Sequence, residues 1–317
     1  MSVHAKTRPA SRSQQAPWWA TPVTAWAVVG ATFLLSGTWV MTRWALADIP
    51  HTLPRVTAEV SAARQILLWG SLALAVVPFC GLVVWLVRQC RKEPALTLDA
   101  MLFLAYTSAF WLGPIGEYEH WTAHRSRFLP GVTSWGPYIP GWHSQTPERQ
   151  IDLWFTGLFG YSLGMMMVLI MAALMRGLFL RKWPGLHGPK FVLAALLCGL
   201  LTDFLSETPF ILAGNYAYVA AVPELTIMAG HWYQIPLYEY ALVGIFWVGI
   251  PCIIRFHGGA PILNGSGRLP HRLKTPVQAM AVIGMVNVCV LCWLGSFAII
   301  NLIADPAYVP DIPLHLR

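Results

Sequence analysis

The chain has 317 residues, of which 56% are hydrophobic and only 11% are charged, whereas an ordinary soluble domain is about 25% charged. With a mean hydropathy of +0.55, this composition all but excludes a soluble globular enzyme, and it excludes a disordered chain, a coiled coil and a collagen. The 16 Trp and 24 Pro residues suit a membrane protein with aromatic belts and interrupted helices.

Several stretches are apolar enough to be transmembrane helices, which need about 20 mainly apolar residues. The seven that qualify are residues 23–42, 65–87, 97–113, 153–175, 191–213, 235–254 and 277–303. The first is too long and too well flanked for a cleaved signal peptide, so we expect it to be retained. The sequence therefore predicts an all-α, polytopic bundle of seven spans. We expect residues 21–304 to form one transmembrane domain, with tails at 1–20 and 305–317.

The Lys and Arg residues predict the orientation, because cytoplasmic loops are enriched in them. With the N-terminus inside, 14 of the 21 basic residues, including all five Lys, lie on the cytoplasmic side. We therefore predict a cytoplasmic basic tail at 1–20 and an exterior C-terminus. Reporter fusions at Arg317 and near Lys182 should report opposite sides, and same-side signals would rule out seven spans. Since this asymmetry explains most of the net charge of +7, we infer no nucleic-acid partner.

Two of the predicted exterior loops differ from the short interior ones. Residues 114–152 contain five Pro, four Gly and six aromatic residues, and residues 214–234 contain no Lys or Arg. A long loop of this composition is more often an ordered lid than a spacer. We expect 114–152 to cover the outer mouth of a cavity, with Trp135 and Trp142 near the acids discussed next.

Apart from Asp99, which lies at the cytoplasmic edge of the third span, where an acid at a helix start is usual, three carboxylates lie inside the predicted spans: Asp203, Glu207 and Glu239. Asp203 and Glu207 are four residues apart and share one helix face, and all three fall in the outer half of the predicted spans. No Lys, Arg or His lies within the spans to pair with them. Intramembrane acids usually mark function, and a protonated acid beside an ionised one is what general acid/base chemistry needs. The alternative is that they only hold helices together.

The 114–152 loop adds Glu117, Glu119, His120, His124 and Asp152 on the same side. Each alone is more often a solvated loop residue, but together they oppose the buried acids. Glu-x-Glu-His is not a recognised metal-ligand spacing, so we predict no metal site. Nucleotide-binding loops, nucleophile elbows and H-E-x-x-H are absent from the sequence. The remaining chemistry is proton transfer and cation stabilisation by carboxylates and aromatic faces.

Two stretches resemble the AveC family of membrane spirocyclases from polyketide pathways. One is Ser134-Trp-Gly-Pro-Tyr-Ile-Pro-Gly-Trp142. The other comprises Asp203-x3-Glu207-Thr-Pro209, Gly214-Asn-Tyr216-Ala-Tyr218 and Gln234-x-Pro236-x-Tyr238-Glu239. The resemblance covers predicted spans three to six, about half of the chain. One departure is Trp111-Leu-Gly113-Pro114, where family members often have Asp before the Pro. If that Asp is catalytic in the family, either Glu117 or Glu119 takes its place in this chain or one activity of the family is missing.

The resemblance implies a cofactor-independent enzyme that closes a dihydroxy-ketone polyketide macrolide to a spiroketal, with or without dehydration of the new ring. Its substrate would be a hydrophobic polyketide. The enzyme would be located in the plasma membrane of an actinobacterium-like producer of secondary metabolites. We expect the catalytic residues to be Glu207, Glu239, Asp203, Glu117 and Glu119. We expect the substrate-binding residues to be Trp111, His120, Trp135, Tyr138, Trp142, Tyr216, Tyr218, Gln234 and Tyr238.

Two other functions fit parts of the pattern. A membrane terpenoid cyclase would use the same acids and aromatic residues, and only its substrate would distinguish it. A proton-coupled transporter or receptor predicts acids along a path through both leaflets, whereas the three found here all lie in one half.

Overall fold

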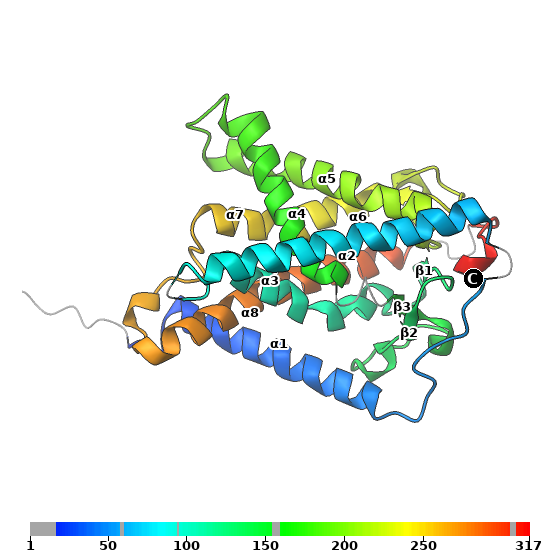
Figure 1. Ribbon diagram of the computed structural model, residues 1–317, viewed down its shortest axis with the longest axis horizontal. Coiled ribbons are helices and arrows are strands. Elements are labelled where there is room, and N and C mark those ends of the chain that lie inside the picture. The colour runs from blue at the N-terminus through cyan, green and yellow to red at the C-terminus, as the bar shows by residue number, and fades with distance from the viewer. Residues whose placement is uncertain (1–16, 58–59, 94, 154–158, 305–308) are drawn as a thin grey trace, which may run out of the picture.

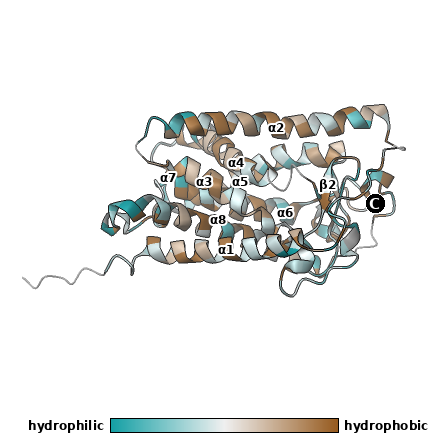
Figure 2. Cartoon of the chain, turned by 60° about the horizontal axis from the view of Figure 1, so that its bottom comes forward, coloured by the Kyte–Doolittle hydropathy of each residue, from teal (hydrophilic) through white to brown (hydrophobic). Residues whose placement is uncertain are grey.

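The computed structural model describes residues 17–57, 60–93, 95–153, 159–304 and 309–317. They form an all-α polytopic bundle of roughly aligned helices, with small two-stranded ribbons gathered at one end (Figure 1). The N-terminal end of α1 and the C-terminus lie at opposite ends of the bundle. Hydrophobic residues run along the helices (Figure 2).

Within the described residues, six helices are long and apolar enough to cross a membrane. They are α1 (Pro22–Ala45), α2 (Ala62–Cys90), α4 with its π-helical extension (Tyr161–Leu180), α5 (Gly188–Ala213), the α6–α7 unit (Leu237–Phe256) and α8 (His271–Asn301). A seventh span results if α3 (Leu98–Ser108) and the 3₁₀ helix η1 (Phe110–Glu117), which meet at a bend of 48°, are counted together. Pro114 lies inside η1, and proline disfavours a continuous α-helix there.

The ribbons pair segments that are far apart in the sequence. Strand β1 (Ala123–Arg125) is antiparallel to β4 (Tyr216–Tyr218). Likewise β2 (Gly131–Thr133) pairs with β3 (Ile151–Leu153), and β5 (Thr226–Ile227) pairs with β6 (Ile235–Pro236). The start predicted at 153 is too early, because Leu153 ends β3 and α4 begins at Tyr161, whereas the start predicted at 235 is within two residues of Leu237, which follows β6. A short apolar run does not by itself distinguish strand from helix.

The first and last helices pack directly against each other. A Cβ atom on Gly30 of α1 would overlap the Met280 carbonyl of α8, and one on Gly284 would overlap the Trp26 carbonyl. Small residues at such crossings let two backbones approach closely. This crossing fixes α1 against α8, which also contributes residues to the cavity described below.

The α6–α7 unit is one continuous helix with a π-helical centre. It begins as α6 (Leu237–Leu242), widens in η7 (Val243–Gly249) and ends as α7 (Ile250–Phe256). A π-bulge changes the angular spacing of side chains and is frequent at functional sites. In this helix Glu239, Val243 and Trp247 all line the same cavity.

The 114–152 segment folds over the end of the bundle that holds the three acids. Its tryptophans anchor it, since Trp135 Nε1 donates to the Trp111 carbonyl at 2.7 Å and Trp142 Nε1 donates to the Pro114 carbonyl at 2.9 Å. The β1–β4 ribbon attaches it to the 214–234 connection. The segment is therefore an ordered cover, as its composition predicted.

Candidate active site

A cavity of about 530 Å³ lies beneath this cover. Its walls come from α2, η1, α4, α5, the α6–α7 unit and α8, together with the β1–β4 ribbon. Leu74 of α2 and Leu205 of α5 line the cavity and are 65% and 57% exposed. The cavity therefore reaches the apolar outer surface of the bundle between α2 and α5.

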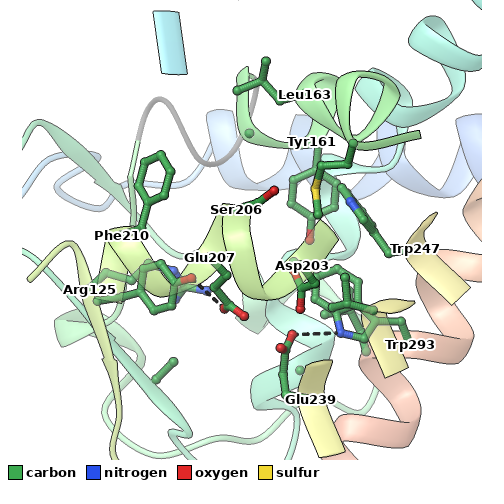
Figure 3. Close-up of a pocket in the computed structure, with 18 of the residues that line it drawn as sticks. Arg125, Tyr161, Leu163, Asp203, Ser206, Glu207, Phe210, Glu239, Trp247 and Trp293 are labelled. Atoms are coloured by element: carbon green, nitrogen blue, oxygen red, sulfur yellow. Dashed lines mark hydrogen bonds between the residues drawn. The ribbon is translucent and has the colours of Figure 1, made fainter. Parts of the chain in front are cut away.

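The three predicted acids meet at the centre of this cavity (Figure 3). Asp203 and Glu207 project from one face of α5, and Glu239 lies in the first turn of α6. One oxygen from each carboxylate lies within 4.8 Å of the others. Asp203 is 3% exposed and Glu239 is 2% exposed. The sequence reasoning that placed these residues in one cluster is thus matched by the geometry.

Neutral donors supply the hydrogen bonds of this acid cluster. The phenols of Tyr216 and Tyr218 both donate to Glu207 Oε1 at 2.6 Å, and the indole of Trp293 donates to Glu239 Oε1 at 3.2 Å. Burial, and then the adjacent Glu207, raise the pKa of both phenols well above the usual range. The two tyrosines therefore remain protonated donors.

Each acid also keeps one free oxygen. Asp203 Oδ2, Glu207 Oε2 and Glu239 Oε2 are buried and have no hydrogen-bond partner. Among the described residues, none of the three forms a salt bridge. Buried polar groups are normally satisfied, so three orphaned oxygens facing one another indicate a place where a ligand supplies the donors.

The same three carboxylates could also hold a metal ion, because their oxygens are close enough together. Oxygen ligands suit hard cations such as Mg²⁺. The cluster contains no His or Cys, so it does not resemble a zinc centre. The residues thus fit a hard divalent cation as well as a set of acids that share protons.

Aromatic rings surround the acid cluster on the side of α4 and α8. Trp247 lies 5.0 Å, centroid to centroid, from both Tyr161 and Trp293, and Phe297 lies 5.7 Å from Tyr218. All five rings line the cavity. Faces of aromatic rings attract cations, so this wall suits a substrate that develops positive charge.

A second charged group, Arg125 with Glu117 and Asp152, lines the same cavity. Arg125 Nη1 lies 2.9 Å from Glu117 Oε1, and its Nη2 lies 3.6 Å from Asp152 Oδ1. Burial raises the pKa of Asp152, and Arg125 partly opposes that shift. The predicted residue Glu117 therefore lines the cavity within an ion pair.

Several other predicted site residues lie outside the cavity wall. Glu119 is near the surface, where its carboxylate lies 2.6 Å from His143, so the structure does not bring it to the acids. Trp111 and Trp142 anchor the cover, as described above. His120 is also absent from the wall, and its buried Nε2 has no partner.

Two predicted binding residues, Gln234 and Tyr238, support the wall from behind, whereas Tyr138 lies against Arg43 of α1, away from the wall. Gln234 donates to the Tyr218 carbonyl at 2.9 Å, and Tyr238 donates to Asn301 Oδ1 at 2.7 Å. The ring of Tyr138 faces the guanidinium of Arg43 at 5.8 Å. Of the predicted binding residues, Trp135, Tyr216 and Tyr218 line the cavity.

Sequence reasoning missed Arg125, Tyr161, Trp247 and Trp293, which all line the cavity. Arg125 counted only as a basic loop residue. No local sequence signal could have placed it, because the strand that brings it into the cavity pairs with β4, some 90 residues later in the chain. The three aromatic residues lie in apolar stretches, where nothing distinguishes them from core residues.

Comparison with known families gives an independent result. The model of the family described as spirocyclase AveC-like matches residues 94–311. The chain belongs to this family. The match covers more than half of the chain and extends the resemblance seen in the sequence through α8, which carries Trp293. The role of the protein is therefore of the spirocyclase type, that of a cyclising enzyme. Neither a curated protein nor a solved structure matches the chain.

Proposed function

We propose that the protein closes a dihydroxy-ketone polyketide macrolide into a spiroketal within this cavity, by general acid/base catalysis. The observation that carries the proposal is the cluster of Asp203, Glu207 and Glu239, with one unpartnered oxygen on each. Family membership supports the spirocyclase role, and the acids supply the proton transfers that such a closure needs.

The reaction proceeds in two additions with loss of one water. The first substrate hydroxyl adds to the ketone and gives a hemiketal. A protonated carboxyl then donates its proton to the hemiketal hydroxyl, which leaves as water, and an oxocarbenium ion remains. The second hydroxyl attacks this ion and gives its proton to a carboxylate. The acid and base exchange roles, so no other reactant is consumed.

The hydrogen bonds suggest which acid plays which part. Glu207 Oε1 accepts from both phenols, and these donors hold the carboxylate that takes the proton of the attacking hydroxyl. Glu239 accepts from the Trp293 indole and is buried beside Glu207, and we assign it the part of the acid. Trp247 and Trp293 stand beside the acids, where their faces stabilise the oxocarbenium ion.

The cavity also suits a hydrophobic substrate that arrives through the bilayer. The opening between α2 and α5 is bordered by Leu74 and Leu205, and α2 also contributes Ala75 and Pro78 to the wall. A macrolide dissolved in the membrane would enter sideways, with its hydroxyls directed to the acids. This placement is compatible with a plasma-membrane enzyme.

The test is incubation of membranes containing the protein with an open-chain dihydroxy-keto macrolide, followed by chiral chromatography and mass measurement. We expect one spiro configuration to dominate, and a second loss of water in the mass would reveal dehydration. Membranes carrying the Glu207→Gln/Glu239→Gln double variant are the control. A product mixture and rate equal to those of the control would reject the proposal. A chelator should leave turnover unchanged if the acids work without a metal, and loss of activity would assign the cluster to a cation.

The two competing functions differ in what they require of the cavity. A terpenoid cyclase would leave the dihydroxy-ketone unchanged in the same incubation. A proton-coupled transporter needs acids along a path through the membrane, whereas the three clustered acids, Asp203, Glu207 and Glu239, lie together at one end of the bundle.

A further inference from the structure

The β1–β4 ribbon places a second polar group beside the acid cluster. Arg125 of β1 is directly opposite Tyr216 of β4, and side chains opposite each other in an antiparallel pair point to the same face. Tyr216 reaches the Glu207 carboxylate, whereas Arg125 reaches Glu117 and Asp152. In Figure 3, Arg125 and Trp293 flank the acids from opposite sides. The ribbon therefore gives the cavity a second polar group, Arg125 with its two acids, that is separate from the cluster of Asp203, Glu207 and Glu239.

The hydrogen bonds of this second polar group are incomplete. Arg125 Nη1 donates to Glu117 Oε1 at 2.9 Å and, more weakly, to the Ile151 carbonyl at 3.4 Å. The other arm of the guanidinium, Nη2, lies 3.6 Å from Asp152 Oδ1, which is beyond an ordinary hydrogen bond. Asp152 is 6% exposed, the Ser134 side chain is a hydrogen-bonding neighbour of its carboxyl, and its buried Oδ2 forms no hydrogen bond of ordinary geometry. A buried carboxylate oxygen next to a cavity thus lacks a donor.

A hydroxyl group is the substituent that fits this pair best. It can donate to Asp152 Oδ2 and accept from the Arg125 guanidinium at the same time, because a hydroxyl is both donor and acceptor. A ketone or an ether can only accept, so it would leave Asp152 Oδ2 unsatisfied. An alkyl group would leave both protein groups without a partner.

We propose that Arg125 and Asp152 bind a third hydroxyl of the substrate, one that takes no part in ring closure, and thereby set which carbon lies at the acids. The inference rests on the proposed function for the identity of the substrate. It makes the substrate class a polyketide with at least three hydroxyls. Arg125 and Asp152 then determine specificity and position, and Glu207 and Glu239 carry the chemistry.

The test uses a panel of open-chain dihydroxy-ketones that differ only in an added hydroxyl at successive carbons, together with the parent that lacks it. Binding to the detergent-solubilised full chain is measured by titration calorimetry, and KM and kcat are measured separately. We expect one member to bind about 10- to 100-fold more tightly than the parent, as charged hydrogen-bond partners typically give. The gain should appear in KM, with kcat nearly unchanged.

Asp152→Ala should reduce this preference to within about threefold, because the acceptor is gone. Arg125→Lys keeps the charge but loses the planar fork, so it should retain only part of the preference. If Asp152→Ala does not fold, the preference of Arg125→Lys is compared with that of wild type instead. The matched control is Asp99→Ala, which removes a buried acid from an Arg pair outside the cavity and should keep the full preference.

The outcomes separate this inference from the proposed function. If all members bind wild type equally, or if the preference survives in both Asp152→Ala and Arg125→Lys, the hydroxyl site is rejected and the pair only holds the cover. If the preference is found but no member is cyclised, the hydroxyl site stands and the proposed reaction fails.

Discussion

Two groups of buried acids at opposite ends of the bundle differ in the partners they have. At the end opposite the cover, Asp99 at the start of α3 accepts from Arg255 of α7 through both of its oxygens, at 2.6 and 2.9 Å. At the covered end, Asp203, Glu207 and Glu239 have no cationic partner among the described residues, and each keeps an orphaned oxygen. A buried acid with a complete set of partners holds helices together. A buried acid with an incomplete set is available to a ligand.

The largest expected effect tests the unsatisfied acids directly. Glu207→Gln or Glu239→Gln keeps the side-chain shape but cannot cycle a proton, so turnover should fall by about 10² to 10⁴-fold. The melting temperature should stay the same or rise, because fewer carboxyls are buried together. Asp203→Asn should have a smaller effect on turnover, since that residue lies one helical turn farther than Glu207 from the covered end of α5. Rate and thermal unfolding are measured on the same preparations.

Two other results would contradict this expectation. Normal turnover in both Gln variants would place the chemistry elsewhere. Variants that do not fold would show that the three acids serve packing after all.

The tyrosines that donate to Glu207 should have the next largest effect. Tyr216→Phe or Tyr218→Phe removes one hydrogen bond to a carboxylate, and each should reduce turnover by about tenfold. The double variant should lose more than the two single losses combined, because Glu207 Oε1 would then be left without a donor. Equal rates in wild type and double variant would show that Glu207 does not need these donors.

The satisfied pair at the other end should affect stability and leave catalysis intact. Asp99→Ala leaves the Arg255 guanidinium without its carboxylate, which should cost about 2 kcal/mol of unfolding free energy, below the range for a fully buried pair. The melting temperature should fall while the turnover of the remaining folded enzyme is unchanged. A large loss of turnover at unchanged stability would erase the contrast between the two ends.

The smallest effect is a pH dependence in the cover. Burial lowers the pKa of His124, whose Nδ1 lies 2.7 Å from the Leu316 carbonyl, and burial followed by Arg64 lowers the pKa of His315. A lowered folded-state pKa means that stability is present above about pH 6.5 and is lost as the pH falls below it.

The melting temperature should therefore be lower at pH 5.5 than at pH 7.5, and the decrease should be smaller in His124→Gln/His315→Gln. The raised pKa of His143, caused by the Gly141 carbonyl and then by Glu119, acts in the opposite direction, but that side chain is exposed and its effect is screened. An equal decrease in wild type and variant would show that these histidines are not responsible.

The acid cluster was predictable from the sequence because of one strong physical constraint. Charged groups are so unfavourable in a bilayer that three acids within apolar stretches require an explanation. The spacing of Asp203 and Glu207 fixed their shared face, and the 21-residue connection allowed Glu239 to join them. The cover over the acids was predictable from its length and composition for a similar reason.

The remainder of the site depends on pairing between distant segments. Arg125 enters the cavity because β1 pairs with β4, some 90 residues later in the chain, and no local pattern specifies that partner. Glu117 and Glu119 were indistinguishable in the sequence, yet the 3₁₀ helix η1 ends at Glu117 and buries it, whereas Glu119 lies beyond the helix and pairs with His143. Trp293 lies in an apolar helix, where the sequence does not distinguish a residue that lines the cavity from one that packs in the core.

The crossing of α1 and α8 at Gly30 and Gly284 has a consequence for how the protein is made. Of the eight α-helices in the described part of the chain, α1 is synthesised first and α8 last. The first helix is therefore in the membrane without its packing partner while the other helices are inserted. Pairing over such a separation is slow to form. Because α8 also carries Trp293 and Phe297, the cavity wall is complete only after translation has passed the final helix. A nascent chain stalled before His271 would therefore lack both the helix pair and the substrate site.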